Sequence, residues 1–255
     1  MVGENHLYVW DDRFLYLTWA IVAGITRRYT VTLLVSLGDE GFTLGDARGK
    51  QQDYQAALVG HDVPRSLDAR RAPLLSLNFD PQSYEYHSLA AMLGRHAVRP
   101  VILRQGVLSR QTVAAAGRGE LDNAALFRLT TSLPRALSDY RPIRMPMDMR
   151  VIHIAQKIKK ELPLTSTLEE LGAEVGLSAH RLTHLFSDKL GISIKSYTLW
   201  ARMRRAVELI ARGESLSDIA YEVGFSDGAH LARTLKHFFG LTPSYVAKGM
   251  TVHML

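Results

Sequence analysis

The hydrophobic positions in the carboxy-terminal part of the chain follow a helical pattern that occurs twice. Leucine, valine and phenylalanine recur every three or four positions over residues 168–190, and the same order returns over residues 216–239. In each copy a glycine, Gly176 or Gly224, interrupts the pattern, and a serine follows shortly after it. This spacing puts the apolar side chains on one face of a helix, and glycine suits the left-handed residue at which a helix ends. Each copy therefore predicts a short helix, a turn and a longer helix.

Two further helices are predicted around these copies. An apolar stripe from Val151 to Leu162 predicts a helix before the first copy. A second stripe, which includes Trp200, predicts a helix over about residues 193–212 that joins the two copies. The carboxy-terminal part is therefore predicted to be all-α, with tandem helix-turn-helix units over about residues 167–190 and 215–239.

The pattern before residue 80 is different, because short runs of β-branched, aromatic and leucine residues alternate with glycine-containing turns. Such a pattern is typical of strands in a sandwich or barrel. The runs predicted as strands are Phe14–Trp19, Tyr29–Ser36, Phe42–Leu44, Gln55–Val59 and Leu74–Phe79. Two helices are predicted to follow, over Tyr84–Arg95 and Leu121–Tyr140, and Pro134 should kink or interrupt the second.

The second of these helices carries a leucine stripe, made of Leu126, Leu129, Leu133 and Leu137. We interpret the stripe as a core face, with a dimer surface as the alternative. The prolines Pro142 and Pro146 then break the helical pattern. The chain is thus predicted to be multidomain. A β-rich domain covers residues 1–140, with strands over about 14–80 and helices over about 82–140, and residues 141–147 link it to the helical domain of residues 148–255.

Amino-acid composition and net charge give only limited information about the binding partner and the cellular compartment. The chain has 255 residues with 31 Lys and Arg against 25 Asp and Glu, and its net charge of +6 is shared evenly by the two halves. A basic chain favours anionic partners such as nucleic acid, but this charge does not indicate where they bind. Since there is no cysteine, disulfides and thiolate metal sites are excluded. The longest apolar run, Phe14–Ile25, is too short to span a bilayer and follows acidic residues, so we expect a cytoplasmic protein with no membrane segment.

The amino-terminal part offers no pattern for catalysis or for a resident metal. His61 and His87 are the only histidines between Leu7 and Arg95, and no His-x-His spacing occurs there. No nucleophile stands beside a base, and no glycine-rich phosphate loop follows a strand. We therefore expect no catalytic residue, no metal and no cofactor.

The carboxy-terminal part resembles the AraC/XylS family of transcription regulators over about residues 150–250. The residues that carry the resemblance in the second copy are Asp218-Ile219-Ala220, Val223-Gly224-Phe225-Ser226-Asp227, Arg233, Phe239-Gly240, Thr242-Pro243 and Tyr245. Those in the first copy and the joining helix are Leu171, Val175-Gly176-Leu177-Ser178, Leu182, Leu185-Phe186, Gly191, Arg202, Arg205-Ala206 and Leu209. The resemblance implies two helix-turn-helix subdomains whose recognition helices enter successive major grooves, roughly 34 Å apart on one face of the duplex.

The resemblance also places the DNA-contacting residues on the outer faces of the two recognition helices. They are His180, Thr183 and His184, with Arg181 beside them, in the first helix, and Ala229, His230, Ala232 and Arg233 in the second. Arg233 is the strongest candidate, because arginine can donate two hydrogen bonds to one guanine. Arg202, Arg205 and Lys236 are weaker candidates for phosphate contacts.

Two departures from the family pattern change these expectations. Gly172 stands where alanine is usual, which should loosen the first short helix slightly. The small residues Gly228, Ala229 and Ala232 predict that the second recognition helix depends mainly on phosphate contacts, thymine-methyl contact and DNA shape.

The amino-terminal part loosely resembles the cupin-like sensor domain that often precedes this DNA-binding module. The metal-binding histidines of such domains have no counterparts, since Arg27-Arg28-Tyr29 and Pro64-Arg65 occupy comparable stretches. We therefore expect a small organic effector, or none, rather than a metal. The resemblance implies a sequence-specific transcription regulator that binds double-stranded DNA, forms a homodimer and contacts RNA polymerase, and the sequence leaves open whether it is an activator or a repressor. The alternative is a cupin-type enzyme or small-molecule binding protein with an accessory helical domain.

Overall fold

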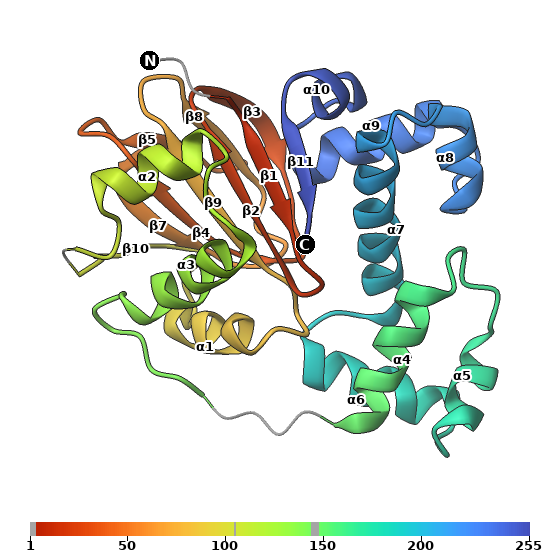
Figure 1. Cartoon of the computed structure of the whole chain (residues 1–255). Helices are drawn as coiled ribbons and strands as arrows, with labels where there is room; N and C mark the ends of the chain where they lie inside the picture. The colour runs from red at the N-terminus through yellow and green to blue at the C-terminus, as the bar shows by residue number, and fades with distance from the viewer. Residues whose placement is uncertain (1–3, 105, 144–147) are drawn as a thin grey trace. The chain divides into compact units, whose positions relative to one another are not determined.

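The computed structural model describes residues 4–104, 106–143 and 148–255, which form two compact units (Figure 1). The first, called here the β-unit, is Met1–Ile143 together with Lys236–Leu255, and the second, the helical unit, is Arg144–Leu235. The domain limits predicted from the sequence remain a prediction, and residues 144–147 of the predicted linker lie outside the described residues.

Among the described residues, the β-unit contains all of the strands, four helices and the last turn of α9. Its elements are β1 (His6–Val9), β2 (Arg13–Thr18), β3 (Ile21–Thr26), β4 (Val31–Ser36), β5 (Phe42–Gly45), β6 (Gln51–Tyr54), β7 (Ala56–Val59), β8 (Arg65–Ala69), β9 (Leu74–Phe79), α1 (Tyr84–Leu93), β10 (Val98–Pro100), α2 (Arg110–Gly117), α3 (Asn123–Arg135), α10 (Pro243–Lys248) and β11 (Thr251–Met254). The strands form a seven-stranded sheet in the order β10-β7-β4-β9-β2-β1-β11 and a four-stranded sheet in the order β3-β8-β5-β6. The prediction of a β-rich amino-terminal region followed by helices is therefore confirmed.

The main core lies between the seven-stranded sheet and the helices α1 and α3 (Figure 1). Alternate residues of each strand point to opposite faces of a sheet, and those of β4 and β9 that face these helices are all apolar. Leu126, Leu129, Leu133 and Leu137 complete this core and are at most 6% exposed. The leucine stripe is therefore a core face and is not available as a dimer surface. α3 ends at Arg135, directly after Pro134, instead of continuing to Tyr140 as predicted.

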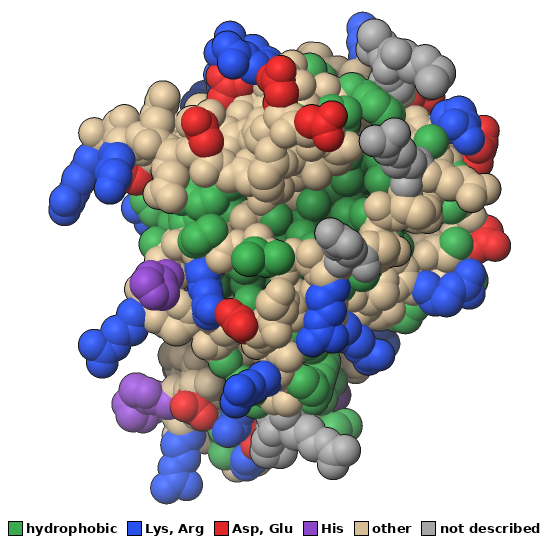
Figure 2. All heavy atoms as spheres, turned by 90° about the vertical axis from the view of Figure 1, so that its left-hand side faces the viewer, with side chains coloured by type: hydrophobic (Ala, Val, Ile, Leu, Met, Phe, Trp, Pro, Cys, Tyr) green, Lys and Arg blue, Asp and Glu red, His purple; other side chains and the backbone are tan. Residues whose placement is uncertain are grey.

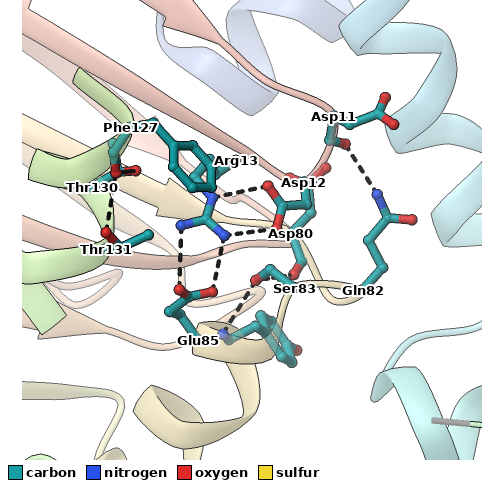
Figure 3. Close-up of polar contacts among 11 residues, drawn as sticks. Asp11, Asp12, Arg13, Asp80, Gln82, Ser83, Glu85, Phe127, Thr130 and Thr131 are labelled. Carbon is teal, nitrogen blue, oxygen red and sulfur yellow. Dashed lines mark hydrogen bonds and ion pairs between the residues drawn. The ribbon is translucent and has the colours of Figure 1, made fainter. Parts of the chain in front are cut away.

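A buried ion pair lies at the edge of this core (Figure 3). The guanidinium of Arg13 is 2.8 Å from a carboxylate oxygen of Asp12 and 3.0 Å from one of Glu85. It also lies over the rings of Phe79 and Phe127, each 5.2 Å from the ring centroid. Arg13 is 4% exposed, so its charge is neutralised inside the protein by two carboxylates.

The last strand was not predicted from the sequence. β11 pairs with β1 in parallel, with His6 opposite Thr251 and Val9 opposite Met254. The Asn5 amide group adds hydrogen bonds to the Tyr245 hydroxyl (2.9 Å) and the Gly249 carbonyl (3.1 Å). The end of the chain is thereby built into the edge of the seven-stranded sheet.

The helical unit contains the elements predicted from the repeat. They are α4 (Met149–Lys160), α5 (Leu168–Glu174), α6 (Ala179–Leu190), α7 (Ile194–Ala211), α8 (Leu216–Glu222) and the greater part of α9 (Gly228–Phe239), whose last turn belongs to the β-unit. Thr167 begins α5 with a capping box, in which the Glu170 carboxylate accepts a hydrogen bond from the Thr167 amide (2.8 Å). Gly176 and Gly224, with φ of +69° and +77°, occupy the left-handed conformation expected in the two turns. None of the helices among the described residues is long and apolar enough to cross a membrane.

Candidate nucleic-acid interface

The amino-terminal half of α6 has one buried and one exposed face. Ser178 begins the helix by accepting a hydrogen bond from the Arg181 amide, and Leu182 and Phe186 are completely buried. The predicted contact residues lie on the other side. His180, Arg181 and His184 are exposed, whereas Thr183 is half-buried and its hydroxyl donates to the Ala179 carbonyl (2.9 Å). The two histidine rings are neighbours, since their Nε2 atoms are 3.2 Å apart.

The start of α9 has the same construction, with small side chains on its outer face. Asp227 accepts a hydrogen bond from the His230 amide (2.7 Å), and this bond is the main reason why the pKa of Asp227 lies below its usual value. Ala229, His230 and Arg233 are exposed, and Ala232 is half-buried. Leu231 and Leu235 are buried on the opposite face. The Arg233 side chain forms no hydrogen bond or ion pair with the residues that the structure describes, although its charge helps to lower the pKa of Asp227, and its exposed guanidinium can contact a ligand.

The His230 side chain is held on this face by its neighbours. Its Nδ1 lies 3.2 Å from the Ser226 hydroxyl, and its ring meets the Phe225 ring edge-on at 5.0 Å. The orientation of this candidate is thus set before any ligand binds.

The weaker candidates for phosphate contacts differ from one another in their surroundings. Arg202, on α7, donates to the Val223 carbonyl and lies 4.5 Å from the centroid of the Phe225 ring. Arg205 pairs with Glu208 and with Glu222, each at 2.8 Å. Lys236 is exposed. Arg202 and Arg205 therefore connect α7 to the second helix-turn-helix. The sequence did not predict this role, because the partner residues Val223 and Glu222 lie about 20 residues further along the chain.

Charge and donor clusters add little to this picture. On the face drawn in Figure 2, which is the left-hand side of Figure 1, Lys and Arg side chains are interspersed with acidic, histidine and apolar ones. Among the described residues no group of three or more His, Cys, Asp or Glu side chains could hold a metal ion. The tandem helices are therefore the feature that points to a function.

Comparison with known proteins agrees with this geometry. The helix-turn-helix domain family matches residues 171–249. The chain carries an AraC-type helix-turn-helix domain. A Staphylococcus aureus (strain MSSA476) protein named as an HTH-type transcriptional regulator is 33% identical over 97 residues, which are 38% of this chain and 13% of that protein. The msm operon regulatory protein of Streptococcus mutans is 32% identical over 82 residues, which are 32% of this chain and 30% of that protein. The chain thus matches less than a third of the length of either relative.

Some solved structures resemble this chain over nearly its whole length, and not only over the AraC-type domain. Apo ToxT from Vibrio cholerae strain SCE256 matches with a TM-score of 0.59 and 12% identity, over 94% of this chain and 98% of that one. ToxT from Vibrio cholerae O395 matches with a TM-score of 0.57 and 14% identity, over 93% and 98%. The chain therefore has a two-domain fold like that of ToxT, with an amino-terminal β domain and a carboxy-terminal helix-turn-helix domain.

Proposed function

We propose that this protein is a sequence-specific DNA-binding transcription regulator that acts by binding and not by catalysis. The observation that carries the proposal is the repeated construction of α6 and α9. Each has a fully buried apolar face, and each presents side chains able to hydrogen-bond to base edges near its amino-terminal end. That end of a recognition helix is the part that enters the major groove.

We propose that the two recognition helices, α6 and α9, make different kinds of contact with DNA. α6 offers His180, Arg181 and His184, which are exposed donors or acceptors. α9 offers one long donor, Arg233, and the exposed His230 among alanines. We infer that α6 supplies most of the direct base contacts, and that α9 adds one arginine–guanine contact and otherwise follows the shape of the DNA.

We also propose that the β-unit binds a small organic effector and that the protein works as a homodimer at promoters, where it contacts RNA polymerase. Structures of ToxT have been solved with an unsaturated fatty acid and with (E)-4-(8-methylnaphthalen-1-yl)but-3-enoic acid. The shared fold and the regulator names of the relatives support the same kind of control here.

Selection of bound fragments from a random DNA pool by the full chain tests the proposal. We expect one enriched motif with two half-sites about one helical turn apart. The double variant Arg233→Ala with His184→Ala should lose the motif, whereas Arg27→Ala, an exposed arginine of the β-unit, should retain it. Binding should also weaken steeply as salt rises, because phosphate contacts release counterions. Enrichment of the same motif by the double variant would contradict the assignment of the site.

A further inference from the structure

Two arginines are buried in the β-unit without an acidic partner. Arg28, between β3 and β4, is 9% exposed, and Arg65, at the start of β8, is 4% exposed. Their hydrogen-bond acceptors are uncharged: the Asn78 side-chain oxygen and the Phe238 and Phe239 carbonyls for Arg28, and the Thr32 hydroxyl and the Val63 carbonyl for Arg65. Among the described residues no carboxylate lies within ion-pair distance of either guanidinium.

The β-unit also contains a buried arginine that does have acidic partners. Arg13 is as deeply buried as Arg65, and two carboxylates neutralise it (Figure 3). An unpaired charge in a protein interior is costly, and most groups avoid the cost by losing the charge. Arginine does not do so at neutral pH. Burial lowers the pKa of Arg28 only to about 10, and it also lowers the pKa of Arg65, with a further contribution from the charge of Arg28. The interior therefore carries two positive charges that an anion would neutralise.

A short chain of hydrogen bonds joins the two guanidinium groups. Arg65 donates to the Thr32 hydroxyl (3.4 Å), which donates to the Asn78 oxygen (2.9 Å), and Arg28 donates to the same oxygen (3.1 Å). Thr32 and Asn78 lie on neighbouring strands, β4 and β9, whereas Arg65 comes from the four-stranded sheet. The two guanidinium groups are thus linked through only two polar side chains, and they lie near enough for the charge of Arg28 to lower the pKa of Arg65.

In place of an anion, Arg28 contacts the carboxy-terminal end of α9, the second recognition helix. Arg28 donates to the carbonyls of Phe238 (3.4 Å) and Phe239 (3.1 Å), the last two residues of α9. Carbonyls at the carboxy-terminal end of a helix carry partial negative charge and lack partners within the helix. The amide of Arg27 also donates to the His237 carbonyl (3.3 Å). The last turn of α9 is therefore held by the same arginine that lacks a counterion.

We propose that Arg28 and Arg65 bind the anionic group, a carboxylate or a phosphate, of a small effector, and that this group displaces the Phe238 and Phe239 carbonyls from Arg28. Anion binding then releases the last turn of α9. A full negative charge outcompetes two carbonyl dipoles for a buried guanidinium, and a carboxylate or phosphate can bind the guanidinium with two parallel hydrogen bonds. The anion site stands independently of DNA binding, whereas its regulatory consequence rests on the function proposed above.

Calorimetric titration of the full chain tests the site. The probes are inorganic phosphate on one side and acetate, benzoate and octanoate on the other, at constant ionic strength, with octanamide as the uncharged control. We expect one class of anion to bind, with at least about a tenfold loss of affinity in Arg28→Gln and in Arg65→Gln, since the charge-assisted bonds are removed. Arg27→Gln is the matched control, because Arg27 is exposed and pairs with Asp62 at 3.3 Å, and it should bind as the wild type does. Equal binding by all variants, or binding of no anion, overturns the proposal.

Two further measurements remain decisive if a glutamine variant folds poorly. Arg65→Met should unfold at a higher temperature than the wild type when no anion is present, because an uncompensated buried charge is removed. A lower unfolding temperature would show that Arg65 is only a structural donor, and would overturn the proposal. In the wild type, the bound anion should speed hydrogen exchange at the Gly240 amide, which donates to the Lys236 carbonyl (2.9 Å), by about tenfold or more. Unchanged or slower exchange would refute the release of α9 without involving DNA, so it is distinguishable from a failure of the proposed function.

Discussion

Replacing Arg202 by alanine separates two roles that the sequence could not distinguish, a phosphate contact and an internal support. The Arg202 guanidinium lies over the Phe225 ring at 4.5 Å and donates to the carbonyl of Val223, a residue that is completely buried. Burial lowers the pKa of Arg202, as expected for a side chain partly withdrawn from water. All three residues belong to the helical unit, so the substitution should act on the second helix-turn-helix.

The expected loss follows from these two contacts. A hydrogen bond from a charged donor contributes about 1.5–3 kcal/mol, and a cation–π contact contributes about 0.5–2 kcal/mol. Arg202 is half-buried, so solvent screening reduces both contributions. We therefore expect Arg202→Ala to lower the free energy of unfolding by about 2–3 kcal/mol.

Urea denaturation of the full chain, followed by far-ultraviolet circular dichroism, measures this loss. The midpoint of the helical transition should fall by on the order of 1 M. Under folding conditions, the slope of log affinity for DNA against log salt should stay unchanged. Lys236→Ala is the matched control, because Lys236 is exposed. It should leave the midpoint unchanged and reduce the salt slope by about 0.9 if it contacts one phosphate.

The opposite result would refute the structural reasoning. If Arg202→Ala unfolds at the same urea concentration as the wild type and its salt slope falls by about 0.9, Arg202 contacts a phosphate and its contacts with Phe225 and Val223 add nothing measurable.

Three other predictions concern the DNA contact, the response to pH and the core. Arg233→Ala should weaken binding to the selected motif by about 1–3 kcal/mol while leaving binding to random DNA almost unchanged, which competition gel-shift assays would show; an equal loss on both would make Arg233 a phosphate contact. Burial lowers the pKa of His87 from its ordinary value of 6.5, so the unfolded chain takes up the proton first and stability falls as the pH drops below about 6.5. The unfolding temperature should therefore be lower at pH 5 than at pH 7.5, and His87→Gln should narrow this difference; an unchanged difference would contradict the assignment to His87. Leu133→Ala, at a position with no exposed area, should cost about 2–5 kcal/mol in urea denaturation, and a loss below 1 kcal/mol would show that the core refills the space.

The repeated helical pattern predicted the carboxy-terminal fold well, because its signals are local. The helix-turn-helix units begin close to the predicted limits, with Thr167 and Ser215 as the first capping residues, and Gly176 and Gly224 adopt the left-handed conformation that their turns require. The same pattern placed most candidate contact residues on exposed positions, although Thr183 and Ala232 are half-buried. Whether these residues contact DNA remains a prediction.

In the amino-terminal part, only the strands with strong apolar patterns were found. Leu74–Phe79 has the predicted limits, whereas β6 is polar and exposed at a sheet edge and has no such signal. The pairing of β1 with β11 joins His6 to Thr251 mainly through backbone hydrogen bonds, which leave little trace in the sequence. The partners of Arg28 and Arg65 also depend on contacts that only the folded chain creates.

Gly172 shows how a propensity argument can miss the deciding contact. Its lack of a side chain was expected only to loosen α5, yet a Cβ at this position would lie 2.5 Å from the Leu177 carbonyl oxygen. The equivalent residue of the second copy is Ala220, whose carbonyl accepts from the Phe225 amide (2.7 Å), much as the Gly172 carbonyl accepts from the Leu177 amide (2.8 Å). The first turn is therefore packed too closely for the alanine that the second turn accommodates.

The parallel pairing of β11 with β1 has a consequence for cutting the chain between residues 144 and 147. One piece would keep β1 with an open edge, and the other would keep β11 with no strand beside it. Unpaired strand edges attract other strands, so each piece alone should aggregate. Produced together, the two pieces should recombine through this shared edge, as a split protein does when its halves complement each other.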